Sequence, residues 1–533
     1  MSPKKTRIKM AKKFNTSVIC DPKRHYMVDV TAKMKVFEGL IDDKCYFTIT
    51  RARQFGKTSA LNWILRNMSD RYLVIPSSFE LYSQENWVDD DSFGRYFCTK
   101  LILACNDIKD ATSVSFWENA KSLQNFNFDI LSQKITEYCH LVGKKVVLMI
   151  DEVDKASNNE VFLRFLSMLR NLYLKREQNG DFAYTFWSVI LAGVYDVKNL
   201  KLKIRPEEEH QYNSPWNVAA DYYLDMTFNP QEISTMLVDY ENDYHIGFDI
   251  KEISEEIYKY TSGYPVLVSR VCKEIDERLG KVWTKESVLK AVKNILKDKD
   301  FTLLDDISKN LQLYNGLHQL MYDIIINGRK FTMSLIDPMV RVALMFSYVK
   351  ENEDGNVDIH NLIFEEAFNA YFVNEFIRKN SSDREDYDSS FDYIQDGELN
   401  MVMVIDRFKE IMADRYKDSD QKFLEKHGRL LFLCFIKPII NGTGFCYFEP
   451  QTKSGGRMDL IVNYNRKEYI VELKIWRGSK YETDGKVQLA KYLTQRGLQE
   501  GYLVTFSFLK NKVVQEEPQW VEYQGKRIYE AVI

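Results

Sequence analysis

Short apolar runs alternate with helix-length segments through residues 45–230, and this alternation constrains the fold more than any other feature. The runs are "CYFTIT" (45–50), "RYLVIP" (71–76), "KKVVLMI" (144–150), "FWSVILAG" (186–193) and "DYYLDMTF" (221–228). Continuously apolar strands separated by helices are typical of a parallel sheet that is covered on both faces. We therefore predict an α/β domain with a parallel sheet in this part of the chain.

The first apolar run leads into "RARQFGKT" (51–58), which ends like the phosphate-binding loop G-x-x-x-x-G-K-[ST] although Arg51 replaces its first glycine. The helix-length segment "SALNWILRNM" (59–68) follows. In a strand, loop and helix of this kind, backbone N–H groups face the phosphates, Lys57 reaches the terminal phosphates and the Thr58 hydroxyl binds Mg²⁺. The predicted nucleotide-binding residues of the loop are Arg53, Gln54, Phe55, Gly56, Lys57, Thr58 and Ser59.

A second motif, "KKVVLMIDEVD" (144–154), ends an apolar run in two adjacent carboxylates, Asp151 and Glu152. In a phosphate-loop enzyme, such an aspartate orients the Mg²⁺ and the glutamate polarises the attacking water. The alternative is a strand that simply meets solvent at an acidic turn. The phosphate-type loop upstream favours the ATPase interpretation, with Thr58 and Asp151 as metal ligands and Glu152 as the catalytic base.

The pattern turns helical from about residue 230 to 380, apart from a helix followed by a small hairpin that turns at Asp354-Gly355 in segment 341–361. Segment 378–398, "RKNSSDREDYDSSFDYIQDGE", is polar and acidic and indicates a linker or an exposed connection. A helical region then extends to about residue 440, and alternating strands follow it.

The segment "GRMDLIVNYNRKEYIVELKIWRG" (456–478) is predicted to form a β-hairpin. A two-residue turn at 465–466 would set Asp459 opposite Glu472, with Lys474 on the same face as Glu472. Two like charges that face each other repel, and a divalent metal between them would remove this repulsion and lower the pKa of bound water. Lys474 would then orient the nucleophile or stabilise developing negative charge. A solvated hairpin in which Lys474 offsets the two acids is the alternative.

Residues 26–61, "YMVDVTAKMKVFEGLIDDKCYFTITRARQFGKTSAL", resemble the start of the bacterial AAA-ATPase-like proteins, which often carry a C-terminal nuclease-like domain. The loop of that family commonly reads R-P-R-R-F-G-K-T, so Ala52 departs from it, as does Val30 where the family often has Lys. The resemblance continues in residues 214–233 and in the lid-like segment "YTSGYPVLVSRVCKEI" (260–275). It implies that Pro265 approaches the nucleotide, although an ordinary turn before an amphipathic helix is the alternative. No residue is assigned as an arginine finger: Arg205 and Arg270 are candidates, and a surface or structural role is favoured for each.

The C-terminal residues resemble the core of the PD-(D/E)XK nucleases, because Asp459 is followed by Glu472-x-Lys474, although Met458 replaces the proline of the family name. This resemblance implies a metal site formed by Glu425, Asp459 and Glu472. It also implies catalytic roles for Asp459, Glu472, Lys474 and, on the following helix, Gln488, which shares a helix face with Tyr492.

The two resemblances together imply an α/β protein of five parts. These are a P-loop (AAA/ASCE-type) parallel-sheet ATPase core with a basic N-terminal tail (1–229), a helical lid (230–285), a helical, winged-helix-like module (286–378), an acidic linker (379–398) and an α/β restriction-endonuclease-like domain (399–533).

The composition limits the partners that such a chain can have. The formal net charge is -4, so a nucleic-acid site must be a local basic patch. The eight cysteines form no C-x-x-C pair and fit a reducing cytosol, and no run of about 18 apolar residues could cross a bilayer. We therefore expect a cytoplasmic protein without a membrane partner.

The first functional hypothesis is an enzyme that binds and hydrolyses ATP with Mg²⁺ and that carries a nuclease dependent on Mg²⁺ or Mn²⁺. Its substrate is nucleic acid, with DNA favoured over RNA, and a defence or mobile-element context follows by analogy only. The alternative is a nucleotide-switched regulator whose nuclease-like domain binds nucleic acid or a protein without cleavage. Assembly into a homo-oligomer stays open.

Overall fold

The computed structural model describes most of the chain. The described residues are 12–17, 19–50, 52, 54–156, 159–179, 184–194, 225–327, 329–379, 393–415, 421–440, 444–448, 460–465, 467–475, 479–506 and 517–533. The chain divides into two compact units, residues 1–283 with 345–347 and residues 284–344 with 348–533. The finer division into five parts stays a prediction.

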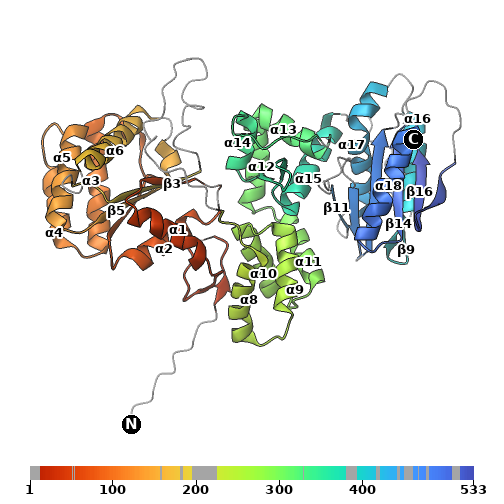
Figure 1. Ribbon diagram of the computed structural model, residues 1–533, viewed down its shortest axis with the longest axis horizontal. Helices are drawn as coiled ribbons and strands as arrows, with labels where there is room; N and C mark the ends of the chain where they lie inside the picture. The colour runs from red at the N-terminus through yellow and green to blue at the C-terminus, as the bar shows by residue number, and fades with distance from the viewer. Residues whose placement is uncertain are drawn as a thin grey trace, which may run out of the picture. The chain divides into compact units, whose positions relative to one another are not determined.

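The first unit contains a four-stranded parallel sheet, as the apolar runs predicted (Figure 1). Its strands in spatial order are β3 (Phe47–Thr50), β6 (Ser188–Gly193), β5 (Val146–Asp151) and β4 (Leu73–Ser78). The helices that connect and cover them are α2 (Lys57–Met68), α3 (Asp90–Asp107), α4 (Ala111–Lys121), α5 (Phe128–Val142) and α6 (Glu160–Asn179). Both motifs of the predicted nucleotide site therefore lie at the carboxyl ends of strands, where ligands of open α/β sheets bind.

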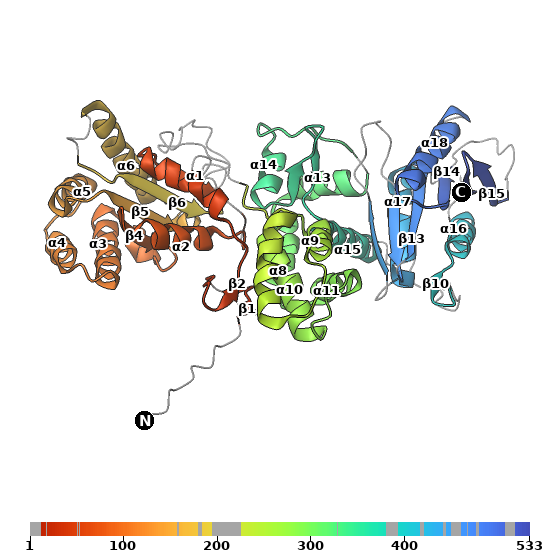
Figure 2. The same cartoon turned by 60° about the horizontal axis from the view of Figure 1, so that its bottom comes forward.

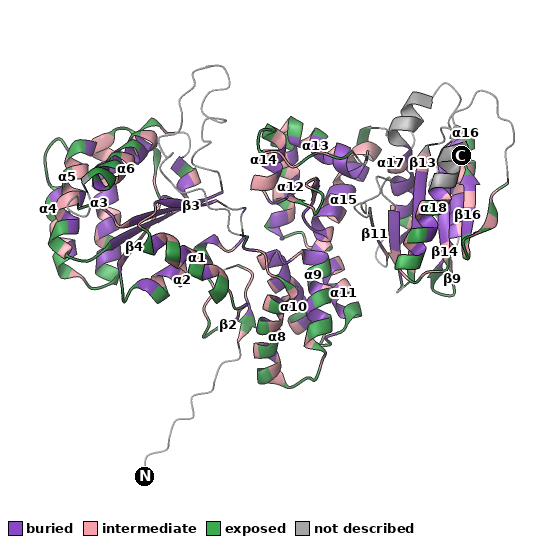
Figure 3. Cartoon of the chain, viewed as in Figure 1, coloured by how far each residue is buried: buried purple, intermediate pink, exposed green. Residues whose placement is uncertain are grey.

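The two faces of this sheet are buried against different helices. Successive side chains of a strand point to opposite faces. Leu148 and Ile150 of β5 belong to a large apolar core with residues of α3, α5 and α6, whereas Met149 and Asp151 face the side of α2. Burial on both faces explains why β3, β5 and β6 are mostly apolar, and Figure 3 shows most of the sheet as buried; β4 is only half-buried at its ends.

The prediction of a strand at residues 221–228 is wrong for the part that is described. Residues 225–228 form no strand, and residues 221–224 lie outside the described residues. The backbone N–H groups of this segment bond elsewhere: Thr227 donates to the Asp225 side chain at 2.9 Å and Phe228 donates to the Gly263 carbonyl at 2.8 Å. An apolar run thus becomes a connection without strand pairing, because its donors bond to the Asp225 side chain and to the Gly263 carbonyl.

The remainder of the first unit comprises the helices of the predicted lid and the N-terminal segment that packs against them. The elements are β1 (Lys13–Phe14), β2 (His25–Tyr26), α1 (Thr31–Asp42), α8 (Pro230–Tyr244), α9 (Ile250–Thr261) and α10 (Pro265–Arg278). The rings of Phe14 and Tyr26 lie 5.3 and 5.2 Å from that of Tyr240 in α8. Lys33 of α1 forms an ion pair of 2.8 Å with Glu232 of α8. The first strands and helix therefore connect the lid to the sheet.

The second unit begins with the predicted helical module. It comprises α11 (Lys285–Lys297), α12 (Thr302–Leu313), α13 (Asn315–Ile325), α14 (Pro338–Met345), β7 (Val349–Glu351), β8 (Val357–Ile359) and α15 (Leu362–Lys379). Strands β7 and β8 pair antiparallel around a turn in which Gly355 has a φ of +74°, so the hairpin predicted at Asp354-Gly355 is confirmed.

The predicted linker is structured at its end. The short strands β9 (Ile394–Gln395) and β10 (Glu398–Leu399) pair antiparallel, while residues 380–392 lie outside the described residues. Glu398 forms an ion pair of 2.8 Å with Lys467, and the Gly397 carbonyl accepts a hydrogen bond of 2.8 Å from the Asn465 side chain. These contacts attach the small hairpin to the C-terminal sheet, which the acidic composition did not predict.

A six-stranded mixed sheet forms the C-terminal part, flanked by helices (Figure 2). The strand order is β11 (Gly444–Phe448), β12 (Leu460–Tyr464), β13 (Lys467–Ile475), β14 (Glu500–Phe506), β16 (Lys526–Val532) and β15 (Gln519–Tyr523). Strands β13, β14 and β16 are parallel. Helix α18 (Ser479–Gln495) packs on the face of Leu503, while α16 (Met401–Arg415) and α17 (Gln421–Ile440) pack on the face of Phe506.

The helices of the described residues include none with both the length and the apolar character needed to cross a membrane.

Candidate functional site

The loop between β3 and α2 has the backbone geometry of an anion site. Gly56 precedes the first residue of α2 and has a φ of +88°, a left-handed conformation that favours glycine. Gln54 also has a positive φ of +58°. Because the first N–H groups of a helix have no partner within the helix, the start of α2 at Lys57 presents donors to an anion. Arg51 and Arg53 lie outside the described residues.

Two neighbouring residues of the loop are buried. Phe55 is 3% exposed, and its ring meets that of Tyr264 edge-on at 4.7 Å. Lys57 is 8% exposed, and its Nζ donates a hydrogen bond of 3.1 Å to the Ala52 carbonyl. The Lys57 ammonium thus lies folded against its own loop, where a phosphate would compete with the carbonyl for it.

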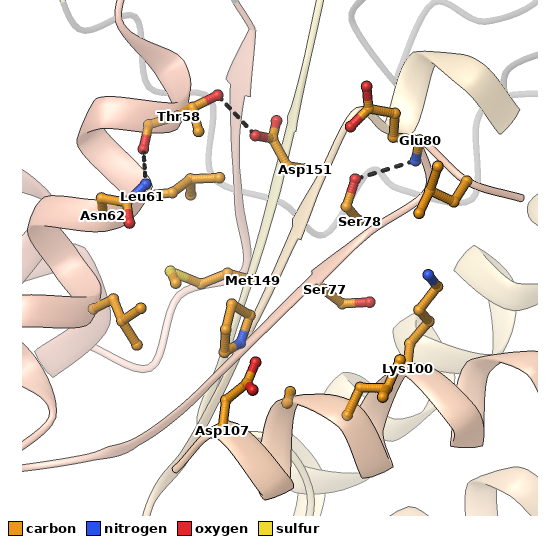
Figure 4. A pocket seen from close by; sticks show the side chains of 15 residues that line it. Thr58, Leu61, Asn62, Ser77, Ser78, Glu80, Lys100, Asp107, Met149 and Asp151 are labelled. Atoms are coloured by element: carbon orange, nitrogen blue, oxygen red, sulfur yellow. Dashed lines mark hydrogen bonds between the residues drawn. The ribbon is translucent and has the colours of Figure 1, made fainter. Parts of the chain in front are cut away.

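The two predicted Mg²⁺ ligands come together, as Figure 4 shows. The Thr58 hydroxyl donates a hydrogen bond of 2.9 Å to Asp151 Oδ2, although the two residues are 93 positions apart in the sequence. A hydroxyl and a carboxylate oxygen are hard donors of the kind that Mg²⁺ prefers, and Mg²⁺ usually takes only one or two carboxylates because phosphates and waters complete its shell. The residue pair therefore fits the ion. No group of three or more His, Cys, Asp or Glu side chains suited to a metal occurs among the described residues.

Glu152 follows Asp151 in an unusual backbone conformation. Its φ is +55°, and its N–H donates to Asp151 Oδ1 at 2.9 Å. Burial raises the pKa of the Glu152 carboxyl, Asp154 and Asp151 add to this effect, and Lys57 opposes it. A raised pKa suits a group that accepts a proton near neutral pH.

A cavity of about 330 Å³ opens beside the Thr58–Asp151 hydrogen bond (Figure 4). It lies between α2, the ends of β4 and β5, and α3. Its walls are mainly apolar, with Leu61, Pro76, Met149 and Ala104 among them, and Lys100 and Asp107 of α3 line the far side. The space beside the predicted metal ligands is therefore partly enclosed by protein.

The turn before α10 approaches the rest of the first unit closely. Gly263 has a φ of +73°, and a Cβ added there would lie 1.9 Å from the Phe228 carbonyl oxygen, so only glycine fits. Pro265 is the first residue of α10. Arg270, a candidate arginine finger, lies 4.0 Å from Glu274 and is 17% exposed, which favours a structural role. Arg205 lies outside the described residues.

The hairpin of the second predicted site has the expected register. Tyr464 pairs with Lys467 and Leu460 pairs with Val471, so two residues separate the paired ends of β12 and β13, the spacing that was predicted. Asp459, the predicted partner of Glu472, lies outside the described residues, and of Glu425 only the position in α17 is described. Of the three predicted metal ligands, Glu472 is therefore the one whose side chain is described.

Glu472 and Lys474 of β13 lie together on the face that α18 covers. Glu472 is completely buried, and Lys474 Nζ lies 3.4 Å from Glu472 Oε1. The stem of Lys474 runs past Gly485 of α18, where an added Cβ would lie 3.3 Å from Nζ. Gln488 follows three residues later on the same helix. The two charged groups of the predicted nuclease motif are thus adjacent.

Sequence reasoning missed a second acid–lysine pair on the same face. Lys486 of α18 forms an ion pair of 2.8 Å with Glu530 of β16, and both side chains are less than one fifth exposed. Leu503 pairs with both Glu472 and Glu530, so the two glutamates stand in one row across three strands. Lys486 lies at helical spacing before the buried residues of α18, so the sequence could have indicated that its side chain faces the sheet. No residue near Lys486 in the sequence indicated that its partner is Glu530.

The comparisons with known proteins identify the family of the larger part of the chain. The model of the AAA-like domain family matches residues 22–344, and the chain belongs to this family. The search of curated proteins found no match to the chain.

Several solved structures are similar to the chain at low scores. The Walker-type ATPase PABY2304 of Pyrococcus abyssi has 12% identity and a TM-score of 0.44, over 67% of this chain and 99% of that one. The Aeropyrum pernix ORC2 protein in its ADPNP–ADP complexes has 10% identity and a TM-score of 0.35, over 68% and 98%. The Aeropyrum pernix ORC1 protein in complex with DNA has 11% identity and a TM-score of 0.30, over 66% and 94%.

Proposed function

We propose that the chain is a Mg²⁺-dependent ATPase whose C-terminal domain acts on nucleic acid. The observation that carries the ATPase part is the hydrogen bond of 2.9 Å between Thr58 and Asp151, at the start of a helix that follows a left-handed glycine. Two motifs far apart in the sequence meet at the carboxyl end of one parallel sheet, as phosphate-loop chemistry requires. Membership of the AAA-like family supports the same assignment.

In this proposal each residue has a distinct role. The N–H groups at the start of α2 hold the phosphates, and Lys57 leaves the Ala52 carbonyl to contact the terminal phosphate. Thr58 and Asp151 would hold Mg²⁺, which would neutralise charge on the phosphates. Glu152 orients the attacking water and accepts its proton, and the rise of its pKa on burial favours that role.

The C-terminal domain is proposed to be a nuclease of the PD-(D/E)XK type that cleaves DNA in preference to RNA. The support is the adjacency of Glu472 and Lys474, 3.4 Å apart on a strand that the register aligns with β12. Asp459, Glu472 and Glu425 would hold Mg²⁺ or Mn²⁺, which would activate water when bound. Lys474 would stabilise negative charge that develops on the phosphate, and Gln488 would help to position the substrate.

A second candidate function rests on the burial of Glu472. A carboxylate that is completely buried beside a lysine already has a cationic partner, and a catalytic metal site needs access for its substrate. This observation favours a regulator in which ATP controls the binding of nucleic acid or protein by a nuclease-like domain that does not cleave.

The ATPase assignment is tested by steady-state hydrolysis and by binding of a fluorescent ATP analogue. Lys57→Ala should abolish binding or turnover, and Glu152→Gln should retain binding and slow turnover. Lys35→Ala, at an exposed lysine of α1, is the matched control and should behave as the wild type. Unchanged hydrolysis in Lys57→Ala would refute the assignment, and normal turnover in Glu152→Gln would move the base elsewhere.

The nuclease assignment is tested with labelled single- and double-stranded DNA and RNA, with and without ATP and with Mg²⁺ or Mn²⁺. Asp459→Ala and Lys474→Ala should remove cleavage while ATP hydrolysis continues. Lys491→Ala, at an exposed position of α18, is the control. Cleavage that persists in both site variants would exclude this site. A wild type that binds DNA only with ATP and never cuts it would support the regulator instead.

A further inference from the structure

The turn after β5 holds the proposed catalytic base in a strained conformation. Glu152 has a φ of +55°, and a left-handed conformation of a residue other than glycine costs about 1 to 3 kcal/mol and persists only where the surroundings impose it. On its N-terminal side, Asp151 belongs to the central strand β5 and accepts the Glu152 N–H. On its C-terminal side, the short helix η2 (Val153–Ala156) begins at the next residue.

The anchor on the C-terminal side is Asp154. Its Oδ1 accepts a hydrogen bond of 3.0 Å from the N–H of Val194, the residue directly after β6. The carboxylate also lies over Gly193: a Cβ added to that glycine would be 2.8 Å from Asp154 Oδ1 and 2.9 Å from Val153 Cγ2. Asp154 therefore connects the turn of Glu152 to the end of the neighbouring strand, and Gly193 leaves the space that this connection needs.

We infer that Asp154 is a positioning residue of the ATPase, which holds Glu152 in place by fixing the turn to the end of β6. The inference rests on the proposed function, in which Glu152 is the catalytic base. Asp154 is not needed to bind nucleotide, because the phosphate contacts belong to the loop before α2 and to the Thr58–Asp151 pair.

The expected effect follows from the geometry. Asp151 is held in the sheet, and among the described residues the Asp154–Val194 hydrogen bond joins a side chain of η2 to the neighbouring strand. Without it, the strain at Glu152 can relax and the carboxylate moves relative to the attacking water. Because a displacement of about 1 Å can lower a catalytic rate about 100-fold, we expect a large fall in kcat with little change in KM for ATP.

Three substitutions separate this role from other roles of Asp154. Asp154→Ala removes the acceptor, and Gly193→Ala keeps the acceptor but places a methyl group where the carboxylate lies. Asp154→Asn keeps an oxygen that can accept from the Val194 N–H and removes only the charge. We expect kcat to fall about 10- to 100-fold in the first two, with KM within about twofold, and to stay within about threefold of the wild type in Asp154→Asn.

The matched control is Asp110→Ala. Asp110 accepts a backbone hydrogen bond of 3.1 Å from Ser113 at the start of α4, so its loss has a comparable cost in stability at a distance from the ATP site. Thermal unfolding of every variant is recorded beside its kinetics. We expect Asp110→Ala to lower the unfolding temperature and to leave kcat unchanged.

A wild type that hydrolyses no ATP refutes the proposed function and this inference with it. If the wild type is active, a normal kcat in Asp154→Ala refutes the inference alone. A loss in Asp154→Asn as deep as in Asp154→Ala also contradicts it, because the hydrogen bond would then not be what matters. An equal loss of kcat in Asp110→Ala would also contradict the inference, because a general loss of stability would then explain the fall in kcat.

Discussion

The buried ion pair between Glu366 of α15 and Lys437 of α17 allows a quantitative prediction. The Lys437 Nζ lies 2.8 Å from Glu366 Oε1, and the side chains are 17% exposed at Glu366 and 14% at Lys437. Burial raises the pKa of Glu366 even with the lysine beside it. Because desolvation nearly offsets the attraction in such a pair, the pair itself contributes little, but an isolated partner is costly.

The perturbation is Lys437→Met, which keeps most of the stem and removes the charge. The Glu366 carboxyl then stays buried and takes up a proton. Holding a carboxyl with an ordinary pKa of about 4.3 protonated at pH 7 costs about 3.7 kcal/mol, and at pH 5 only about 1 kcal/mol. In this variant the pKa of Glu366 is higher in the folded state than in the unfolded state. The stability of the variant is therefore fully present below about pH 4.3 and falls as the pH rises above that value. We expect the loss of stability to shrink by about 2.7 kcal/mol between pH 7 and pH 5.

The assay follows unfolding of this unit within the full chain. Cys434 and Cys446 are buried thiols of α17 and β11, and the six other cysteines belong to the first unit. Labelling with 4,4′-dithiodipyridine at rising urea concentration, followed by mass spectrometry of the peptides that hold these two cysteines, therefore reports exposure of the region at either pH. The control is Glu366→Leu with Lys437→Met, which leaves no buried charge and should be within about 1 kcal/mol of the wild type. A loss in Lys437→Met that is equal at pH 5 and pH 7 would refute the reasoning, as would a double variant less stable than the single one.

Four further substitutions test the packing of the first unit by thermal unfolding. Gly263→Ala should lower the stability of this unit by at least about 3 kcal/mol, because the added Cβ would meet the Phe228 carbonyl at 1.9 Å in a left-handed backbone. Its control is Gly280→Ala, which should cost only about 1 kcal/mol because Gly280 has a φ of +65° but open space around it. Arg176→Met should cost about 3 kcal/mol, since the buried guanidinium donates to three backbone carbonyls, and a change under 1 kcal/mol would contradict this. Asn229→Ala should cost about 1 kcal/mol by removing the N-cap of α8, and an unchanged unfolding temperature would disprove that role.

Local patterns predicted much of the fold for an identifiable reason. Burial on both faces makes a parallel strand continuously apolar, so β3 to β6 could be found from the sequence. The register of β12 and β13 follows from a two-residue turn, because each strand then pairs outward from it. The segment 221–228 has the same apolar pattern but did not form a strand in its described part, since the Phe228 N–H bonds to Gly263, 35 positions later. A pattern of hydrophobicity does not record the destination of backbone donors.

The candidate site divides in the same way. The chemistry of its members could be read from adjacent residues: a glycine, a lysine and a threonine before a helix, and two acids after a strand. Motifs of this kind are defined by residue types at fixed spacings, so their order along the chain carries the information. The partners of Asp154 and Lys486 could not be read in this way, because Val194 and Glu530 lie 40 and 44 positions away.

The sequence by itself therefore determined the class of the N-terminal domain, the position of its predicted phosphate loop and the acids predicted to accompany it. Each of these depends on spacing within a few turns or one strand. Only the tertiary structure decided that Thr58 contacts Asp151 and that Asp154 joins the turn of Glu152 to the end of β6. It also decided that Glu472 is buried with Lys474 beside a second acid–lysine pair. Such pairings are set by the order of strands and by the helix that packs over them, which no short segment of the chain encodes.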